Sequence, residues 1–323
     1  MRIGGRDVRR VLTAPLDVGH WRALGGMMRV YPAAEIPGNL SRYLRRAGSF
    51  PRDTTVKTPM GTVSMRLDTA HDLLTLNEIF ARGDYEADGH LQVAVDIGAN
   101  IGIASLYFLT RNRTSRVYCV EPDPKNIARL KRTLAPYRGR YTIEEVAADL
   151  SDGNATLFTE PTGRYGGLVQ GSKQGTIPVH TRAMTSLVDA VLAREDRIDV
   201  LKVDVEGLEE KLVRALRPDQ LDRISVIYYE TPYSAPLHTD RYNYRFGNQT
   251  NALRRKWPAH GTPASAGTFD ARAPAFCTGP EDLSPRDRTK WAKARRVLEV
   301  EGAASERRVT PPRPWGKRPT RLL

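Results

Sequence analysis

The chain has few cysteines and no long apolar segment. Only 2 of its 323 residues are cysteine, which is too few for a disulfide framework or a cysteine-based metal cluster. The apolar runs are much shorter than the roughly eighteen residues that a membrane span requires. Gly, Pro and Asp interrupt the basic N-terminus before a signal-like apolar block develops. These absences predict a cytoplasmic protein without a zinc site or a membrane span, and they leave open whether carboxylates such as Asp204 and Glu206 hold a magnesium ion.

Acidic residues are also in the minority. Lys and Arg total 50 against 37 Asp and Glu, which gives a net charge of +13, and clustered basic residues can neutralise nucleic-acid phosphates. However, 40 of the 50 basic residues are Arg, a bias typical of GC-rich genomes. Residues 257–323 carry 13 basic and 7 acidic residues, so almost half of the excess lies in that segment. The charge distribution therefore disfavours a nucleic-acid partner.

Three regions differ in their sequence pattern. Residues 1–90 form an N-terminal extension, in which 54–67 predict a β-hairpin and 69–85 predict an amphipathic helix. Residues 91–256 alternate apolar runs with helical stretches, which is typical of an α/β domain with parallel strands. Residues 257–323 are rich in Pro, Arg and Ala. That composition predicts a disordered tail or a segment translated out of frame.

The central region predicts a doubly wound, mostly parallel sheet. Its expected strands cover residues 91–97, 116–121, 141–147, 198–205 and 224–230, and its expected helices cover 101–111, 123–135, 184–194 and 207–216. A further pair of strands, 155–160 and 176–181, brackets a Gly-rich loop. Helices cover both faces of such a sheet, and ligands bind at the carboxyl ends of its strands.

The end of the first expected strand carries the clearest motif, Asp-x-Gly-x-x-x-Gly. Asp96 ends the strand, and the turn after it contains Gly98, Ala99, Asn100 and Gly102. Glycines let the backbone approach a ligand closely before the next helix begins, whereas an acid at this position repels pyrophosphate and attracts an ammonium group. S-adenosylmethionine carries an ammonium, a carboxylate and a sulfonium, so Asp96 and the backbone amides of the turn are predicted to bind its amino-acid end.

The next two strands supply candidates for the nucleoside end. Glu121 ends the second strand, where an acid can accept hydrogen bonds from both ribose hydroxyls. After the third strand, Ala147 and Ala148 leave room for a flat ring, and Asp149 is placed to accept a hydrogen bond from an adenine amino group.

Four segments together resemble the FkbM-type S-adenosylmethionine-dependent methyltransferases. They read "NEIFARGDY", "VDIGANIGIAS", "VEPDPKNIARLKRTL" and "LKVDVEGLEEKLVRAL", and the resemblance covers roughly residues 65 to 240. It implies the Rossmann-like fold of class I methyltransferases, S-adenosyl-L-methionine as cofactor and O-methyl transfer. It implies an acceptor hydroxyl on a sugar, glycan, glycolipid or polyketide-type metabolite without naming it.

The fourth and fifth strands end in candidate catalytic residues. Lys202, Asp204 and Glu206 alternate in sequence and would share one face of an extended chain. Glu230 ends the fifth strand. Methyl transfer to a hydroxyl requires removal of a proton as the oxygen attacks, so the three carboxylates are candidate bases, and Lys202 is their cationic partner.

Alternatives to this interpretation remain at the level of sequence. His180 and His238 are weaker candidates for the base. An RNA methyltransferase is favoured by the net charge but lacks a recognisable RNA-binding module. A non-catalytic descendant of the fold would keep the strands while losing the acceptor side.

Overall fold

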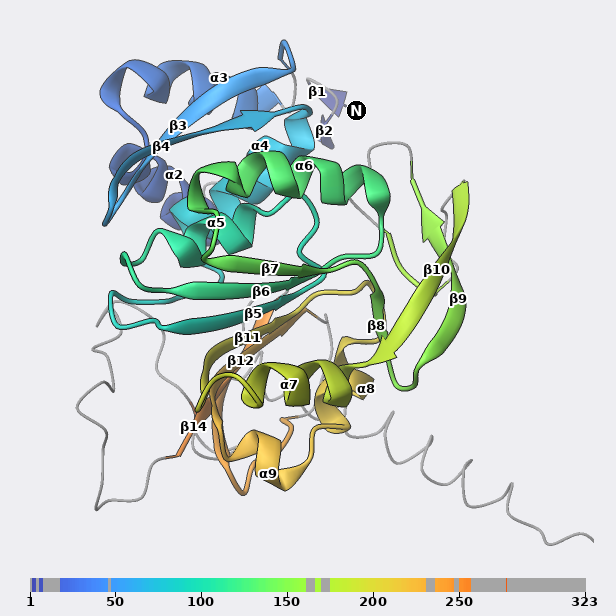
Figure 1. The fold of residues 1–323 in the computed structure, drawn as a ribbon. Helices are drawn as coiled ribbons and strands as arrows, with labels where there is room; N and C mark the ends of the chain where they lie inside the picture. The colour runs from blue at the N-terminus through green and yellow to red at the C-terminus, as the bar shows by residue number, and fades with distance from the viewer. Residues whose placement is uncertain are drawn as a thin grey trace, which may run out of the picture.

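A seven-stranded sheet lies at the centre of the computed structural model (Figure 1). The structure describes residues 2–3, 6–7, 18–45, 48–160, 166–169, 175–230, 236–246, 250–256 and 277. The tail predicted at 257–323 lies outside these residues except for Cys277, whose backbone pairs with that of Tyr244.

The order of the strands confirms the predicted fold class. Across the sheet the strands are β7 (Tyr141–Glu144), β6 (Arg116–Val120), β5 (Val93–Ile97), β11 (Ile198–Val203), β12 (Ile224–Glu230), β14 (Thr250–Arg255) and β13 (Tyr242–Phe246). The first five are parallel, and β14 runs antiparallel to both of its neighbours. This is the doubly wound sheet of class I methyltransferases, and its closing hairpin is complete before residue 257.

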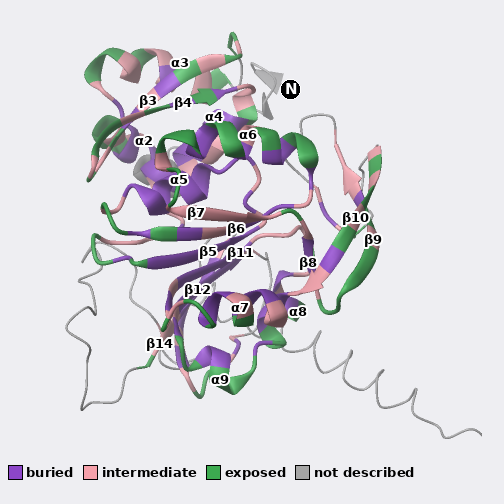
Figure 2. Cartoon of the chain, in the orientation of Figure 1, coloured by how far each residue is buried: buried purple, intermediate pink, exposed green. Residues whose placement is uncertain are grey.

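Helices cover both faces of the sheet (Figure 1). One face packs against α5 (Ile103–Leu109), α6 (Pro124–Leu134), the short η4 (Ala135–Tyr137) and the N-terminal segment; the other packs against α7 (Met184–Leu192), α8 (Glu209–Arg214) and α9 (Pro218–Leu221). In β12, Val226 and Tyr228 join one core, while Ile227 and Tyr229 join the other. The central strands are therefore apolar on both sides and appear as buried in Figure 2.

A second, three-stranded sheet stands near the carboxyl ends of the central strands. It consists of β8 (Ala147–Asp149), β10 (Gly175–Ala183) and β9 (Gly153–Thr159) in that order, and Figure 1 shows β9 and β10 standing beside the main sheet. The predicted extra pair of strands is confirmed. The run 141–147, predicted as one strand, is instead divided between β7 and β8, which belong to different sheets.

The N-terminal residues form a layer over α5 and α6 (Figure 1). Its elements are β1 (Arg2–Ile3), β2 (Arg6–Asp7), α2 (Val18–Val30), η2 (Ala33–Glu35), α3 (Ile36–Arg45), β3 (Arg52–Thr58), β4 (Gly61–Leu67), α4 (Ala70–Leu76) and η3 (Asn77–Arg82). The predicted hairpin is present as β3 and β4, which pair in antiparallel register.

The predicted amphipathic helix begins at a capping box. Thr69 Oγ1 accepts from the Asp72 amide at 3.2 Å, and Asp72 Oδ2 accepts from the Thr69 amide at 2.9 Å. Leu73, Leu76 and Ile79 are buried on the face toward the core, as their spacing predicts. The helix differs from the expected one in its second half, because residues 77–82 wind as a π-helix before Gly83 ends it with φ 75°. Such π-helical turns are frequent at functional sites.

Close contact between α2 and η3 depends on one of two adjacent glycines. A Cβ on Gly26 would lie 1.8 Å from the carbonyl oxygen of Ala81, whereas a Cβ on Gly25 would meet nothing within 4 Å. We expect Gly26→Ala to lower the free energy of unfolding by roughly 1–3 kcal/mol, because the helices must separate. Gly25→Ala is the matched control and should raise it by about 0.5–1 kcal/mol. Urea unfolding of both variants measures the two effects, and equal values would contradict this packing.

Candidate active site

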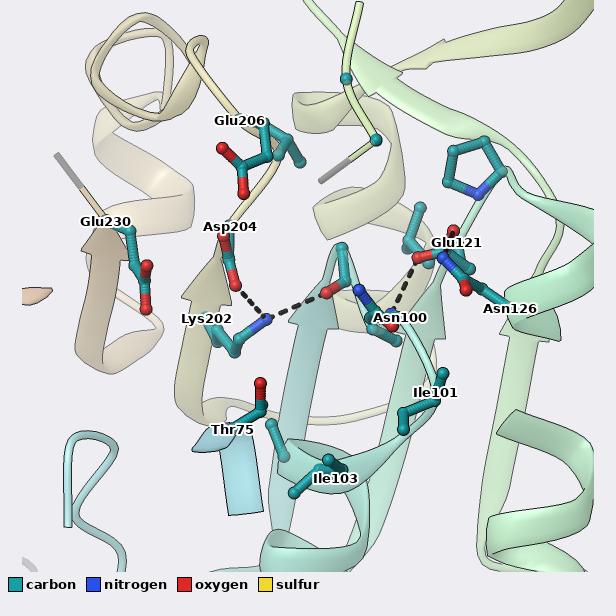
Figure 3. A pocket seen from close by; sticks show the side chains of 18 of the residues that line it. Thr75, Asn100, Ile101, Ile103, Glu121, Asn126, Lys202, Asp204, Glu206 and Glu230 are labelled. Carbon is teal, nitrogen blue, oxygen red and sulfur yellow. Dashed lines mark hydrogen bonds and ion pairs between the residues drawn. The ribbon is translucent and has the colours of Figure 1, made fainter. Parts of the chain in front are cut away.

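A pocket opens at the carboxyl ends of the central strands. It encloses about 1220 Å³ of space free of protein atoms, including the part open to solvent. Its wall comes from the turn after β5, the ends of β6, β11 and β12, the second sheet, and the N-terminal segment from α4 to Tyr85. Figure 3 shows Glu230, Asp204 and Glu206 on one side of it and Glu121 and Asn126 on the other.

The ammonium group of Lys202 lies at the base of this pocket. The strands β11 and β5 pair in parallel and place Lys202 beside Asp96. Lys202 Nζ lies 2.9 Å from Asp96 Oδ1 and 3.4 Å from Asp204 Oδ2. It also donates to the carbonyl oxygen of Gly98 at 3.0 Å. Burial alone would lower the pKa of Lys202, but Asp96, and then Asp204, outweigh burial and raise it. Lys202 therefore stays charged.

Asp96 occupies a different place from the one predicted. Its side chain is fully buried and does not line the pocket. Besides contacting Lys202, it accepts a hydrogen bond from Ser105 Oγ of α5 at 2.6 Å. The predicted direct contact with the ammonium of the cofactor is corrected, because a buried cation of the protein itself needs this carboxylate.

The turn after β5 brings the backbone into the pocket. Gly98 has φ 76°, and a Cβ there would lie 1.8 Å from the carbonyl oxygen of Asp204, so only glycine fits. Asn100 also has a positive φ, 50°, and its backbone N–H donates to Glu121 Oε2 at 2.8 Å. Gly102 does not line the pocket. Instead, Gly102 is the N-cap residue of α5 and has φ 85°. A Cβ at this position would lie 2.7 Å from Leu130 Cδ1.

Glu121 lies where the sequence predicts it, with its carboxylate against the pocket. Oε1 accepts from the Asp123 amide at 3.0 Å and from Asn126 Nδ2 at 3.4 Å. The side chain is only 5% exposed, and this burial raises its pKa to about 7 although the hydrogen bonds lower it. The carboxylate is therefore fixed in place, and its ionisation is displaced toward neutral pH.

An apolar slot adjoins Glu121. Its lining consists of Val120, Pro122, Val146, Ala147, Ala148, Leu157 and Leu168. The predicted room beside Ala147 and Ala148 is thus part of the pocket. Asp149 does not line it, and its carboxylate accepts from the adjacent Leu150 amide at 2.7 Å. The predicted contact between Asp149 and an adenine amino group is therefore corrected.

A tight turn follows β11 and carries two of the candidate bases. The strand ends at Val203, and Glu206 has φ 62°, so Glu206 is not in the extended chain that would align it with Lys202 and Asp204. Glu209 holds the turn by accepting from the amides of Val205 at 3.2 Å and Gly207 at 2.9 Å. The side chains of Asp204 and Glu206 nevertheless both line the pocket.

Glu230 faces these residues from the end of β12. Its Oε1 accepts from the hydroxyl of Tyr85 at 2.6 Å, and Tyr85 is only 2% exposed. Burial, followed by the charge of Asp204, raises the pKa of Glu230 to about 8. Burial likewise raises the pKa of Tyr85 well above its ordinary value. A neutral phenol thus donates to a carboxyl group that ionises just above neutral pH.

Carboxylates dominate the polar lining of the pocket. Seven of them line it, namely Asp72, Glu78, Asp84, Glu121, Asp204, Glu206 and Glu230, against the cations of Arg129 and Lys202. Arg129 is itself paired with Asp72 at 2.5 Å and with Asp68 at 2.7 Å. Arg82 also pairs with Glu78 and Asp84, so the lining holds more acidic than basic side chains, in contrast to the net positive charge of the whole chain.

The two weaker candidates from the sequence lie outside this site. His180 on β10 shares a hydrogen bond with Asn154 at 2.7 Å, and His238 shares one with the carbonyl oxygen of Val213 at 2.8 Å. Neither lines the pocket.

Comparison with known proteins identifies a similar family. The model of the methyltransferase FkbM domain matches residues 96–248, which span the strand ends that build the pocket. This match, over just under half of the chain, makes the segment similar to the FkbM methyltransferase domain. Over 157 residues it is 27% identical to the 2-O-methyltransferase NoeI of Sinorhizobium fredii, an alignment that covers 43% of this chain and 62% of the relative. The match therefore spans less than two thirds of that relative's length.

Solved structures of methyltransferases also resemble the chain. The methyltransferase FkbM of Methylobacillus flagellatus is 14% identical, with 76% of this chain and 59% of that chain covered and a TM-score of 0.38. An rRNA methylase of Streptococcus thermophilus is 10% identical, with 57% of this chain and 95% of that chain covered and a TM-score of 0.32.

Part of the pocket lies outside the matched FkbM domain. His71, Asp72, Thr75, Glu78 and Asp84 all line it from the N-terminal segment. Of these, the sequence singles out only Glu78, which lies with Tyr85 in a segment that precedes the first strand and could close over the cofactor. The signal in the sequence is weak here and consists of the segment "NEIFARGDY", because its polar side chains alternate with the apolar face of an ordinary amphipathic helix.

Two further findings concern the described residues. No group of three or more His, Cys, Asp or Glu side chains among them has an arrangement suited to a metal ion. None of the described helices has the length and apolarity needed to cross a bilayer.

The buried ion pair predicts a large effect of removing one partner. We expect Lys202→Met to lower the free energy of unfolding by about 3–5 kcal/mol, since Asp96 would remain buried without its cation. Lys131→Met is the control, because Lys131 pairs with Glu145 on the surface, where both side chains are more than half exposed, and such pairs contribute little. Denaturant unfolding of both variants gives the comparison; a small loss for Lys202→Met would contradict the assigned role.

Proposed function

We propose that this chain is an S-adenosyl-L-methionine-dependent O-methyltransferase, and that its acceptor is a hydroxyl of a sugar, glycan, glycolipid or polyketide-type metabolite. One observation carries the proposal: the same pocket is lined by the three candidate bases and by five of the predicted cofactor residues, namely Gly98, Ala99, Asn100, Glu121 and Ala148. The catalytic domain would comprise residues 91–256, within which the family match at 96–248 lies, and the preceding segment would complete its wall.

The residues present suit the proposed cofactor. Gly98 and Ala99 line the pocket with little or no side chain, which would leave their backbone accessible to an amino-acid moiety, while the close approach of the Asp204 carbonyl to Gly98 fixes the position of this turn. Glu121 would accept hydrogen bonds from ribose hydroxyls, since a carboxylate has lone pairs beyond those already used. The apolar slot beside Ala148 would hold the adenine. The excess of carboxylates would attract a sulfonium cation.

The remaining residues would act on the acceptor. S-adenosylmethionine supplies an electrophilic methyl group when bound. Asp204, Glu206 and Glu230 would orient the acceptor hydroxyl by hydrogen bonds and hold its proton as the oxygen attacks. Lys202 would act indirectly, because its contacts with Asp96 and the Gly98 carbonyl fix the cradle relative to Asp204.

The charge of the pocket supports an acceptor without phosphate near its reacting hydroxyl. Glu121, Glu206 and Glu230 line the pocket beyond the carboxylates that pair with Arg82, Arg129 and Lys202, and in their ionised forms they would repel a phosphodiester brought to the same place. This argues against an RNA substrate despite the net charge of the chain. The name of the relative NoeI, a 2-O-methyltransferase, agrees with a hydroxyl acceptor.

Acceptor selectivity tests the function directly. The purified chain is incubated with S-adenosylmethionine and a panel of neutral oligosaccharides, their phosphate esters, hydroxylated polyketides and an RNA oligonucleotide. We expect release of S-adenosylhomocysteine and a methylated product only with uncharged acceptors, because the carboxylates exclude phosphates. Methylation of RNA, or faster turnover of the phosphate esters, would overturn the proposed acceptor class.

Cofactor binding should depend on the ionised form of Glu121. Because its pKa is about 7 in the free protein and hydroxyl donors favour the charged form, binding should release protons at neutral pH and tighten as the pH rises from about 6 to 8. Calorimetry in buffers of different ionisation enthalpy measures this release.

A variant of Glu121 isolates its contribution. We expect Glu121→Gln to weaken binding by about 10- to 100-fold and to reduce proton release, because the amide cannot accept as a charged group does. Glu145→Gln is the control, since Glu145 is exposed and lies outside the pocket. Equal affinities of the two variants for the cofactor would refute the assignment of Glu121.

A further inference from the structure

The contact between Glu230 and Tyr85 joins segments far apart in the chain. Glu230 ends β12, whereas Tyr85 follows η3 of the N-terminal segment, 145 residues earlier. The 2.6 Å hydrogen bond lies at the pocket, which both side chains line. Tyr85 also packs edge-on against Tyr228 at 5.7 Å between ring centroids, and its ring lies 5.5 Å from Lys202 Nζ. The phenol is therefore held in place on three sides.

The three candidate bases differ in what holds them. Asp204 pairs with Lys202, so taking up a proton would cost it that ion pair. Glu206 sits on a turn with a positive φ. Glu230 is fixed by a strand and by a hydroxyl donor, and the Tyr85 hydrogen bond leaves lone pairs of its carboxylate for an acceptor hydroxyl.

From this arrangement we propose that Glu230 is the general base of methyl transfer and that Tyr85 is a positioning residue that tunes it. The inference rests on the proposed function and selects one of its three carboxylates. As the acceptor oxygen bonds to the methyl carbon, the carbon–sulfur bond breaks with its electron pair on sulfur, and the hydroxyl proton moves to Glu230. The Tyr85 hydroxyl keeps donating to the carboxylate and orients it.

The electrostatic surroundings of Glu230 place its ionisation in a useful range. Titratable and charged groups face this pair from several elements: Glu78 from η3, Asp84 beside Tyr85, Lys202 from β11 and Asp204 from the turn after it. Burial and Asp204 raise the pKa of Glu230 to about 8, while Tyr85 and Lys202 lower it. A base is most effective when its pKa lies near the working pH.

The sign of the pH dependence follows from this balance. The base is active when ionised, so turnover should rise with pH and level off above the pKa of Glu230. Removing the Tyr85 hydroxyl takes away a hydrogen bond that favours the ionised form. The rising limb of Tyr85→Phe should therefore move to higher pH by about one unit. A purely structural loss would lower stability without moving this limb.

The experiment compares two tyrosine–glutamate pairs in the full chain. Glu230→Gln should lower kcat by roughly 100- to 10,000-fold while S-adenosylmethionine still binds, and Tyr85→Phe should shift the pH profile. The matched controls are Tyr118→Phe and Glu195→Gln, because Tyr118 donates to Glu195 at 2.8 Å away from the pocket. These controls should keep the wild-type profile. Near-wild-type kcat in Glu230→Gln, or an unmoved limb in Tyr85→Phe, would overturn the inference.

A second measurement separates this inference from the proposed function. NMR titration of isotope-labelled glutamate carboxyls, with Glu230 assigned from the Glu230→Gln spectrum, should give a midpoint near 8, displaced upward in Tyr85→Phe. An ordinary, undisplaced midpoint would refute the pair whether or not an acceptor is found. Conversely, a wild-type chain that titrates as expected but methylates none of the acceptors would count against the proposed function alone.

Discussion

The buried ammonium of Lys202 determines the geometry of the whole pocket. A charge that is 3% exposed is tolerable only with close partners, and these partners come from different parts of the site: Asp96 of β5, the carbonyl of Gly98 and Asp204. Satisfying one cation therefore fixes the turn after β5 against the turn after β11. The cofactor side and the acceptor side of the pocket are positioned by the same interaction.

Charge is distributed unevenly over this protein, and the distribution matters more than the sum. The chain carries a net charge of +13, yet carboxylates outnumber cations in its pocket seven to two. Electrostatic effects decay over about 10 Å at moderate ionic strength, so a ligand inside the pocket experiences the local charges. Burial raises the pKa of Glu121 and Glu230, which limits the repulsion among these acids.

The N-terminal segment is part of the site as well as a cover for the core. Arg129 of α6 pairs with Asp68 and Asp72 at the start of α4, which anchors this segment over the sheet. The same segment then brings Tyr85 to the end of β12. The hydrogen bond between Tyr85 and Glu230 thus joins the N-terminal part of the pocket wall to the end of β12, the last parallel strand of the sheet.

The sequence by itself determined the alternation of strands and helices, the resemblance to the FkbM methyltransferases, and the strand ends at which the pocket lies, because periodicity and glycine positions are local properties. It also placed Glu121, Lys202 and Glu230 at the pocket. Only the tertiary structure decided which way each side chain faces. Asp96 turned inward because Lys202, 106 residues later, lies beside it on the neighbouring strand. Asp149 at the end of β8 accepts from the adjacent Leu150 amide instead of lining the pocket, and Glu206 lies in a turn with a positive φ instead of in extended chain. Tyr85 pairs with Glu230 through a contact between distant segments that no local pattern encodes.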